Sequence, residues 1–181
     1  AGRGLSETCA DPAVRFIAAH GGTVRFGATL RAIEWRDDTP AALRFDSEAV
    51  PVATGDRVVL AAPPTAAQRL LPGLTVPEGS SAIVNAHMRF DGPVDWPWRA
   101  PLAGLIGGTA QWIFHRDDIV SVTVSAADAL AERPSEDIAA ILWQDVARAL
   151  GRSDATPPAI RVVKEKRATF HQTPAQVARR P

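Results

Sequence analysis

The stretch that decides the fold is Ile83-Val84-Asn85-Ala86-His87-Met88-Arg89-Phe90. Every second side chain from Val84 onward is apolar, and the three residues between them, Asn85, His87 and Arg89, are polar. A period of two predicts a β-strand whose alternate side chains lie on opposite faces. Because antiparallel sheets commonly bury one face and leave the other open to water, we expect residues 83–90 to lie in such a sheet.

The residues that follow predict the rest of this sheet and its cover. Residues 120–124 alternate in the same way, and with 111–115 they predict an antiparallel hairpin that turns near Asp117-Asp118. Residues 135–150 carry apolar side chains at helical spacing, with Ser135 expected as the N-cap and Gly151 as the stop. Residues 160–170 predict a final strand.

The first part of the chain has a different pattern. A helix is expected from Asp11, as its N-cap, to Gly21-Gly22. Strands are expected over 23–35, with a bend at Gly27, and over 42–45 after a turn at Asp37-Asp38. Residues 56–62 form a continuous apolar run, typical of a strand buried on both faces of a parallel sheet, and 65–71 predict a short helix.

The change of pattern near residue 75 predicts two lobes. We expect an α+β or α/β fold. Residues 1–74 would form a lobe with a parallel sheet, residues 75–172 a lobe with a mixed or antiparallel sheet and helices, and residues 173–181 a tail.

Composition excludes several classes of protein. The 181 residues carry 20 Lys+Arg and 20 Asp+Glu, so the chain lacks the positive field of a nucleic-acid binder. The single Cys9 excludes an intramolecular disulfide, and no Cys/His spacing predicts a zinc site. No run approaches the roughly 20 apolar residues of a membrane span. Because the chain starts at Ala1 without Met, we expect a piece of a longer protein.

The short motifs in the chain give little evidence for a particular function. His115-Arg116-Asp117 matches the start of a kinase catalytic loop, but Val122 stands where that loop needs a metal-binding Asn. Trp96 and Trp98 lie in a proline-rich loop. They either line an apolar ligand pocket or an interface, or pack the loop onto its own lobe, and we favour the packing role.

The polar face of residues 83–90 admits two interpretations. Asn85, His87 and Arg89 either form a solvated outer face or line a cavity. If the face lines a cavity, His87 is the one residue of the three that titrates near neutral pH.

Three stretches, taken in this order and at this spacing, resemble the flavin-containing amine oxidase superfamily. Residues 20–26 contain the Gly-Gly pair that ends a helix and the start of a strand. Residues 29–33 resemble a strand that contacts the flavin, and residues 56–63 a strand that returns to the dinucleotide-binding sheet. Residues 83–91, 111–116 and 166–170 look like its squalene-associated FAD-dependent desaturase branch, the hydroxysqualene dehydroxylases of hopanoid synthesis.

The resemblance implies an FAD-dependent oxidoreductase that reduces hydroxysqualene, a long apolar isoprenoid, to squalene. It implies that residues 1–74 form part of a Rossmann-like FAD-binding lobe and residues 75–172 the substrate-binding lobe. It implies that Leu30 contacts the flavin and that the substrate pocket draws on Asn85, His87, Arg89, Trp112 and Phe114. No catalytic residue is assigned, and no metal is implied. The glycine-rich fingerprint for the FAD pyrophosphate is expected before Ala1 and a Gly-Asp motif after Pro181, so the chain alone is not expected to bind FAD tightly or to turn over.

Other readings stay open. A carotenoid desaturase or an amine oxidase of the same superfamily is the nearest alternative, and a non-catalytic module that binds an apolar ligand or partner is another. We expect a cytoplasmic protein, and an apolar substrate adds peripheral membrane contact as a second expectation. The sequence leaves the oligomeric state open.

Overall fold

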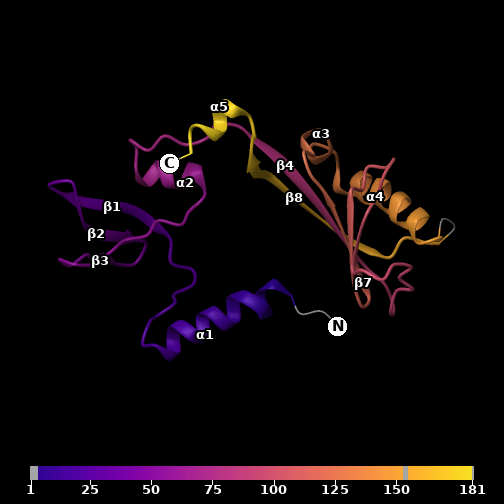
Figure 1. Cartoon of the computed structure of the whole chain (residues 1–181), viewed down its shortest axis with the longest axis horizontal. Coiled ribbons are helices and arrows are strands. Elements are labelled where there is room, and N and C mark those ends of the chain that lie inside the picture. Colours follow the sequence, from indigo (N-terminus) through magenta and orange to yellow (C-terminus); the bar gives the residue numbers. More distant parts are fainter. Residues whose placement is uncertain (1–3, 153–154, 181) are drawn as a thin grey trace. The chain divides into compact units, whose positions relative to one another are not determined.

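The structure is a computed structural model that describes residues 4–152 and 155–180 (Figure 1). The chain divides into two compact units. We call residues 78–173 the sheet unit, and residues 4–77 together with 174–180 the hairpin unit.

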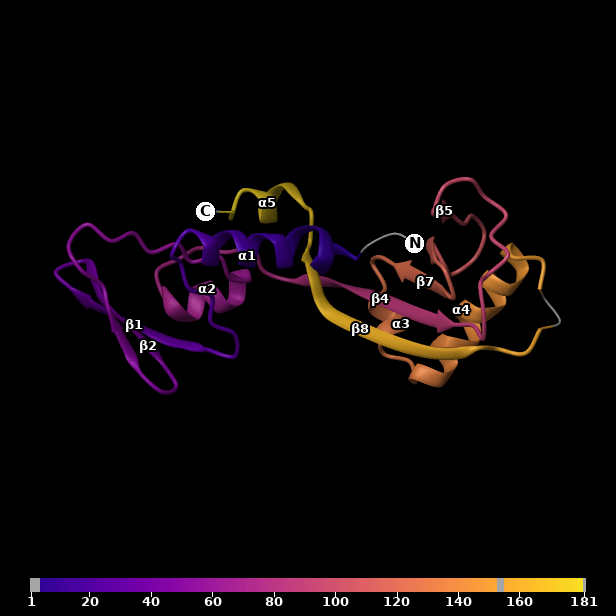
Figure 2. The same cartoon turned by 90° about the horizontal axis from the view of Figure 1, so that it is seen from below.

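The sheet unit is built on five antiparallel strands in the order β5-β6-β7-β4-β8. Strand β4 spans Ser80–Arg89 and lies between β7 and the long edge strand β8, which spans Ala159–Phe170; Figure 2 shows β4 and β8 side by side. The other strands are β5 (Leu102–Gly104), β6 (Trp112–Arg116) and β7 (Ile119–Val124). The predicted strand, hairpin and final strand are therefore confirmed.

The alternation in β4 determines which side chains are buried. Val84, Ala86 and Met88 are completely buried, and they face Val124, Val122 and Val120 of β7 in register. The β6–β7 turn forms where predicted, with Asp117 in the left-handed region at φ 59°. One face of the sheet is thus a continuous aliphatic surface.

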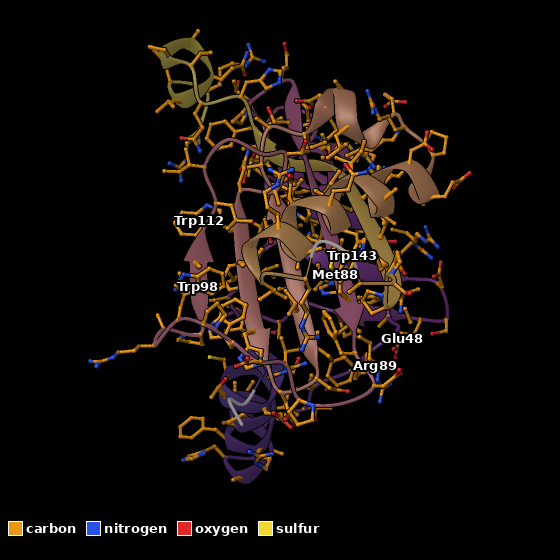
Figure 3. The ribbon with its side chains drawn as sticks, turned by 90° about the vertical axis from the view of Figure 1, so that its right-hand side faces the viewer. Glu48, Met88, Arg89, Trp98, Trp112 and Trp143 are labelled. Carbon is orange, nitrogen blue, oxygen red and sulfur yellow. The ribbon has the colours of Figure 1, made fainter. Side chains whose placement is uncertain are left out.

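Helices α3 (Asp128–Ala131) and α4 (Ser135–Ala149) cover this face (Figure 1). Ile138, Leu142 and Val146 of α4 are completely buried in the core cluster. Met88 of β4 and Trp143 of α4 belong to the same cluster and are labelled in Figure 3.

The ends of α4 differ in part from expectation. Gly151, at φ 65°, follows the helix as predicted. Ser135 is not the N-cap: Pro134 holds that position at ψ 147°, and its carbonyl accepts the first helical hydrogen bond from Ile138 at 3.2 Å. Because Pro134 already closes the first turn, Ser135 is the first residue of the helix.

The proline-rich loop packs onto its own unit, which confirms the role favoured for its tryptophans. Trp96 and Trp98 are both partly buried against the core cluster. The indole Nε1 of Trp96 donates to the carbonyl of Ala100 at 2.7 Å, and its ring stacks on His115 with centroids 4.9 Å apart.

Asp145 of α4 fixes the loop between β5 and β6. Its Oδ2 accepts hydrogen bonds from the backbone amides of Thr109 at 2.7 Å and Ala110 at 2.9 Å. A Cβ atom on Gly108 would lie 2.7 Å from the same carboxylate, so only glycine allows this close approach. The loop that leads into β6 is therefore tied to the helix.

The hairpin unit contains a second antiparallel sheet, β1-β2-β3, with β1 (Leu30–Arg36) and β2 (Thr39–Phe45) forming the hairpin seen in Figure 2. Strand β3 spans Ala49–Pro51, and helix α2 spans Pro64–Leu70. The turn at Asp37-Asp38 is confirmed, with both residues at positive φ. Helix α5 (Pro174–Val177) lies in the tail.

Three expectations for the hairpin unit are wrong. Asp11 is not an N-cap, because a π-helical turn (Ser6–Ala10) precedes α1 (Asp11–Ala19) and already satisfies its first turn. Residues 23–26 form no strand, because Gly27 at φ 70° bends the chain before β1. Residues 56–62 form no strand either, because they pair with no strand among the described residues, and Val59 is 86% exposed.

These observations make the fold α+β, with helices packed on an antiparallel sheet. No parallel pairing occurs within residues 4–152 and 155–180, so the expected Rossmann-like strand is part of neither sheet. In the same residues no helix has the length and apolar character that crossing a membrane requires.

The first prediction concerns the contact between helix and sheet. Leu142→Ala is expected to lower the free energy of unfolding by about 2–5 kcal/mol, because it leaves a cavity at a fully buried site. Gln144→Ala, on the exposed side of the same helix, should change it by less than about 0.5 kcal/mol. Urea unfolding followed by tryptophan fluorescence measures both, and equal effects would contradict this packing.

The second prediction concerns the loop anchor. Asp145→Ala is expected to lower the free energy of unfolding by about 1–3 kcal/mol, because it leaves two partly buried amides without an acceptor. The amides of Thr109 and Ala110 should then exchange with deuterium about tenfold faster or more. Asp137→Ala, at an exposed position on α4, is the control. Unchanged exchange at both amides would show that the carboxylate does not hold the loop.

Candidate functional site

The five-stranded sheet has a second face, opposite α3 and α4, which we call the open face. The strand register sets out its side chains in rows. One row crosses all five strands through Leu102, Phe114, Ser121, His87 and Arg161. The row on one side of it contains Trp112, Thr123, Asn85 and Val163, and the row on the other side contains Arg116, Ile119 and Arg89.

The structure places all five predicted pocket residues on the open face. These residues, none of them buried, are Asn85, His87, Arg89, Trp112 and Phe114. Trp112, labelled in Figure 3, is 47% exposed, in contrast to Trp143 in the core at 6%. Contact of these five residues with a substrate stays a prediction.

Hydrogen bonds between neighbouring strands orient the polar side chains of this face. His87 Nδ1 lies 2.9 Å from Ser121 Oγ, and Thr123 Oγ1 donates to Asn85 Oδ1 at 2.7 Å. Arg89 Nε donates to the Asp118 carboxylate at 3.3 Å. Asn85, His87 and Arg89 of β4 therefore each have a partner from β7 or from the turn before it.

A hollow of about 420 Å³ opens on this face around His87. Its lining combines three hydrogen-bonding side chains, His87, Arg116 and Ser121, with the apolar side chains of Phe114 and Ile119. Beside it, exposed apolar side chains continue across β6 and β5 through Trp112, at 47% exposure, and Leu102, at 43%. Such an arrangement suits a ligand with a long apolar part and one small polar group.

Leu30, the predicted flavin contact, lies in the hairpin unit. It begins β1, is half-buried, and pairs with Phe45 of β2. The next residue, Arg31, donates through Nε to Asp46 at 2.5 Å. That hydrogen bond holds the pKa of the Asp46 carboxyl below its usual range.

The residues of this chain do not fit a complete FAD site. A flavin dinucleotide needs backbone amides of a G-x-G-x-x-G turn at a helix N-terminus to hold its pyrophosphate, and the sequence contains no such motif. Within the described part of the chain, no three His, Cys, Asp or Glu side chains gather where they could hold a metal ion.

Three residues of the hollow were not among the predicted site residues: Arg116, Ile119 and Ser121. A signal for them was present in the turn at Asp117-Asp118. A two-residue turn there pairs Arg116 with Ile119 and therefore Phe114 with Ser121, so the alternation of 119–124 would have placed Ser121 on the face of Phe114.

Comparison with known proteins gives relatives over almost the whole chain. Hydroxysqualene dehydroxylase of Sinorhizobium fredii is 41% identical over 178 residues, and that of Rhodopseudomonas palustris is 44% identical over 179 residues. Each alignment covers 98% of this chain and 42% of the relative. The chain thus spans about two-fifths of the length of these curated relatives.

A solved structure shares the fold. A double mutant of putrescine oxidase has a TM-score of 0.62 and 22% sequence identity, over 85% of this chain and 38% of that one. Residues 4–173 match the family described as flavin containing amine oxidoreductase. These findings confirm the resemblance drawn from the sequence, and the chain belongs to the flavin-containing amine oxidoreductase family.

Proposed function

We propose that this chain is part of an FAD-dependent oxidoreductase that reduces hydroxysqualene to squalene, a step of hopanoid synthesis. Two curated relatives named hydroxysqualene dehydroxylase, each more than 40% identical over nearly the whole chain, support the reaction. The structural observation that carries the proposal is the open face. There a small polar hollow adjoins exposed apolar side chains, as an alcohol on a long hydrocarbon requires.

In this proposal the sheet unit is the substrate lobe. Asn85, His87 and Arg89 border the polar part of the site, and Trp112 and Phe114 contact the hydrocarbon. Bound flavin would supply the reducing electrons, while the sheet orients the substrate and keeps water away from it. No side chain of this chain is assigned a proton transfer.

The hairpin unit would be part of the cofactor lobe, with Leu30 at the flavin. Its large apolar side chains support packing against further protein. Leu5, Phe16, Phe26 and Val59 are 82%, 65%, 83% and 86% exposed, respectively. Exposed apolar side chains in such number mark surfaces that contact other protein, ligand or lipid. The pyrophosphate of FAD would then be held by residues other than those of this chain.

The apolar nature of the proposed substrate also bears on where the protein is located in the cell. A long isoprenoid partitions into lipid, so we propose a cytoplasmic protein that contacts the membrane surface peripherally. Sedimentation with lipid vesicles tests this contact, and a protein that stays wholly in the supernatant would contradict it.

The reaction is tested on the full-length protein. We expect flavin absorbance in the purified protein and, with a reductant, conversion of hydroxysqualene to squalene but not conversion of phytoene or an amine. Turnover of phytoene or an amine instead would favour a sister enzyme. Absence of flavin would contradict the enzyme and favour a binding module.

A third prediction tests the open face. The double variant with Trp112 and Phe114 both replaced by Ala is expected to bind substrate about 10- to 30-fold more weakly. Each half-exposed ring would contribute about 1 kcal/mol of binding free energy when the substrate covers it. Ile106→Ala, at a fully exposed loop residue away from this face, is the control. Equal affinity of the double variant and the control would remove the open face from the site.

A further inference from the structure

We propose that His87, Ser121 and Arg116 form a subsite for the hydroxyl group of the isoprenoid alcohol, which lets the open face distinguish the alcohol from the corresponding hydrocarbon. This inference rests on the proposed function and adds the residues that recognise the polar end of the substrate. All three side chains line the 420 Å³ hollow.

The hollow contains hydrogen-bonding groups that the protein itself does not use. His87 uses Nδ1 in its contact with Ser121 Oγ, at 2.9 Å, which leaves Nε2 without a partner among the described residues. Across those same residues, the guanidinium of Arg116 makes no ion pair or side-chain hydrogen bond. Arg89, by contrast, is paired with Asp118.

These groups match a hydroxyl, which has one proton to donate and two lone pairs to accept. Arg116 carries only donors, so it binds a lone pair of the substrate oxygen. When His87 Nδ1–H donates to Ser121, its Nε2 accepts the substrate proton; in the other tautomer Ser121 donates to Nδ1, and Nε2–H donates to the oxygen. The ring makes one hydrogen bond to the substrate in either tautomer.

The apolar part of the same ligand has a surface adjacent to these groups. Phe114 and Ile119 lie within the hollow, and the row of Ser121 and Phe114 continues to Leu102 on β5. Neighbouring strands are about 4.8 Å apart, so the row from β7 to β5 spans roughly 10 Å. The hydrocarbon next to the hydroxyl therefore lies across β6 toward β5.

Such a subsite binds the alcohol in preference to the hydrocarbon. A hydrocarbon that occupies the hollow displaces water from Arg116 and His87 without replacing its hydrogen bonds, whereas an alcohol replaces them. The product of the proposed reaction lacks the hydroxyl. The subsite therefore favours binding of the alcohol and release of the hydrocarbon.

The test compares two probes, farnesol and the hydrocarbon farnesene, by calorimetric titration of the full-length protein. We expect farnesol to bind about tenfold more tightly than farnesene. Arg116→Met and His87→Phe should each reduce this ratio to about two or less, while the affinity for farnesene stays the same. Arg161→Met, on the same row but outside the hollow, is the matched control and should keep the tenfold ratio.

The outcomes separate this inference from the proposed function. A tenfold ratio that survives in both variants, or equal binding of the two probes to the unchanged protein, overturns the hydroxyl subsite and leaves the apolar site standing. Failure of both probes to bind contradicts the proposed function itself. Unchanged farnesene affinity shows in each variant that the fold is intact.

Discussion

Packing of α4 on one face of the five-stranded sheet is the interaction on which the rest of the structure depends. Ile138, Leu142 and Val146 are fully buried against the aliphatic side chains of β4 and β7, at about 1.5–3 kcal/mol for each side chain removed from water. Because side chains alternate along a strand, burying Met88 and its neighbours sends His87 and Arg89 to the opposite face. The composition of the open face is thus a consequence of how the core is made.

Register determines what the open face can recognise. The turn at Asp117 pairs Phe114 with Ser121, and the pairing of β7 with β4 then places Ser121 beside His87. A slip of one residue would move Ser121 into the core and bring Val122 to the open face, at a large cost in burial. The same contacts that stabilise the sheet therefore hold a polar hollow next to Phe114 and Trp112.

Much of the sheet unit could be predicted from the sequence, because its strands show a clear period of two and its helix a clear apolar stripe. The residues around 56–62 could not, since a continuous apolar run does not reveal whether partner strands are present, and here the described residues provide none. Likewise, the alternation in 83–90 placed His87 on a polar face, but its neighbour Ser121 depended on a register between distant strands. A local pattern shows which side chains share one face of a strand, whereas the composition of a site also depends on how neighbouring strands pair.

We propose that the isoprenoid lies on the open face of the five-stranded sheet. The most direct measurement is photo-crosslinking of the full-length protein with a diazirine-bearing isoprenoid alcohol, followed by peptide mapping of the label. We expect label in residues 85–89, 112–116 and 119–123, and loss of this label when unlabelled alcohol competes. Label confined to α4 or to the hairpin unit, with none in these strands, would contradict it.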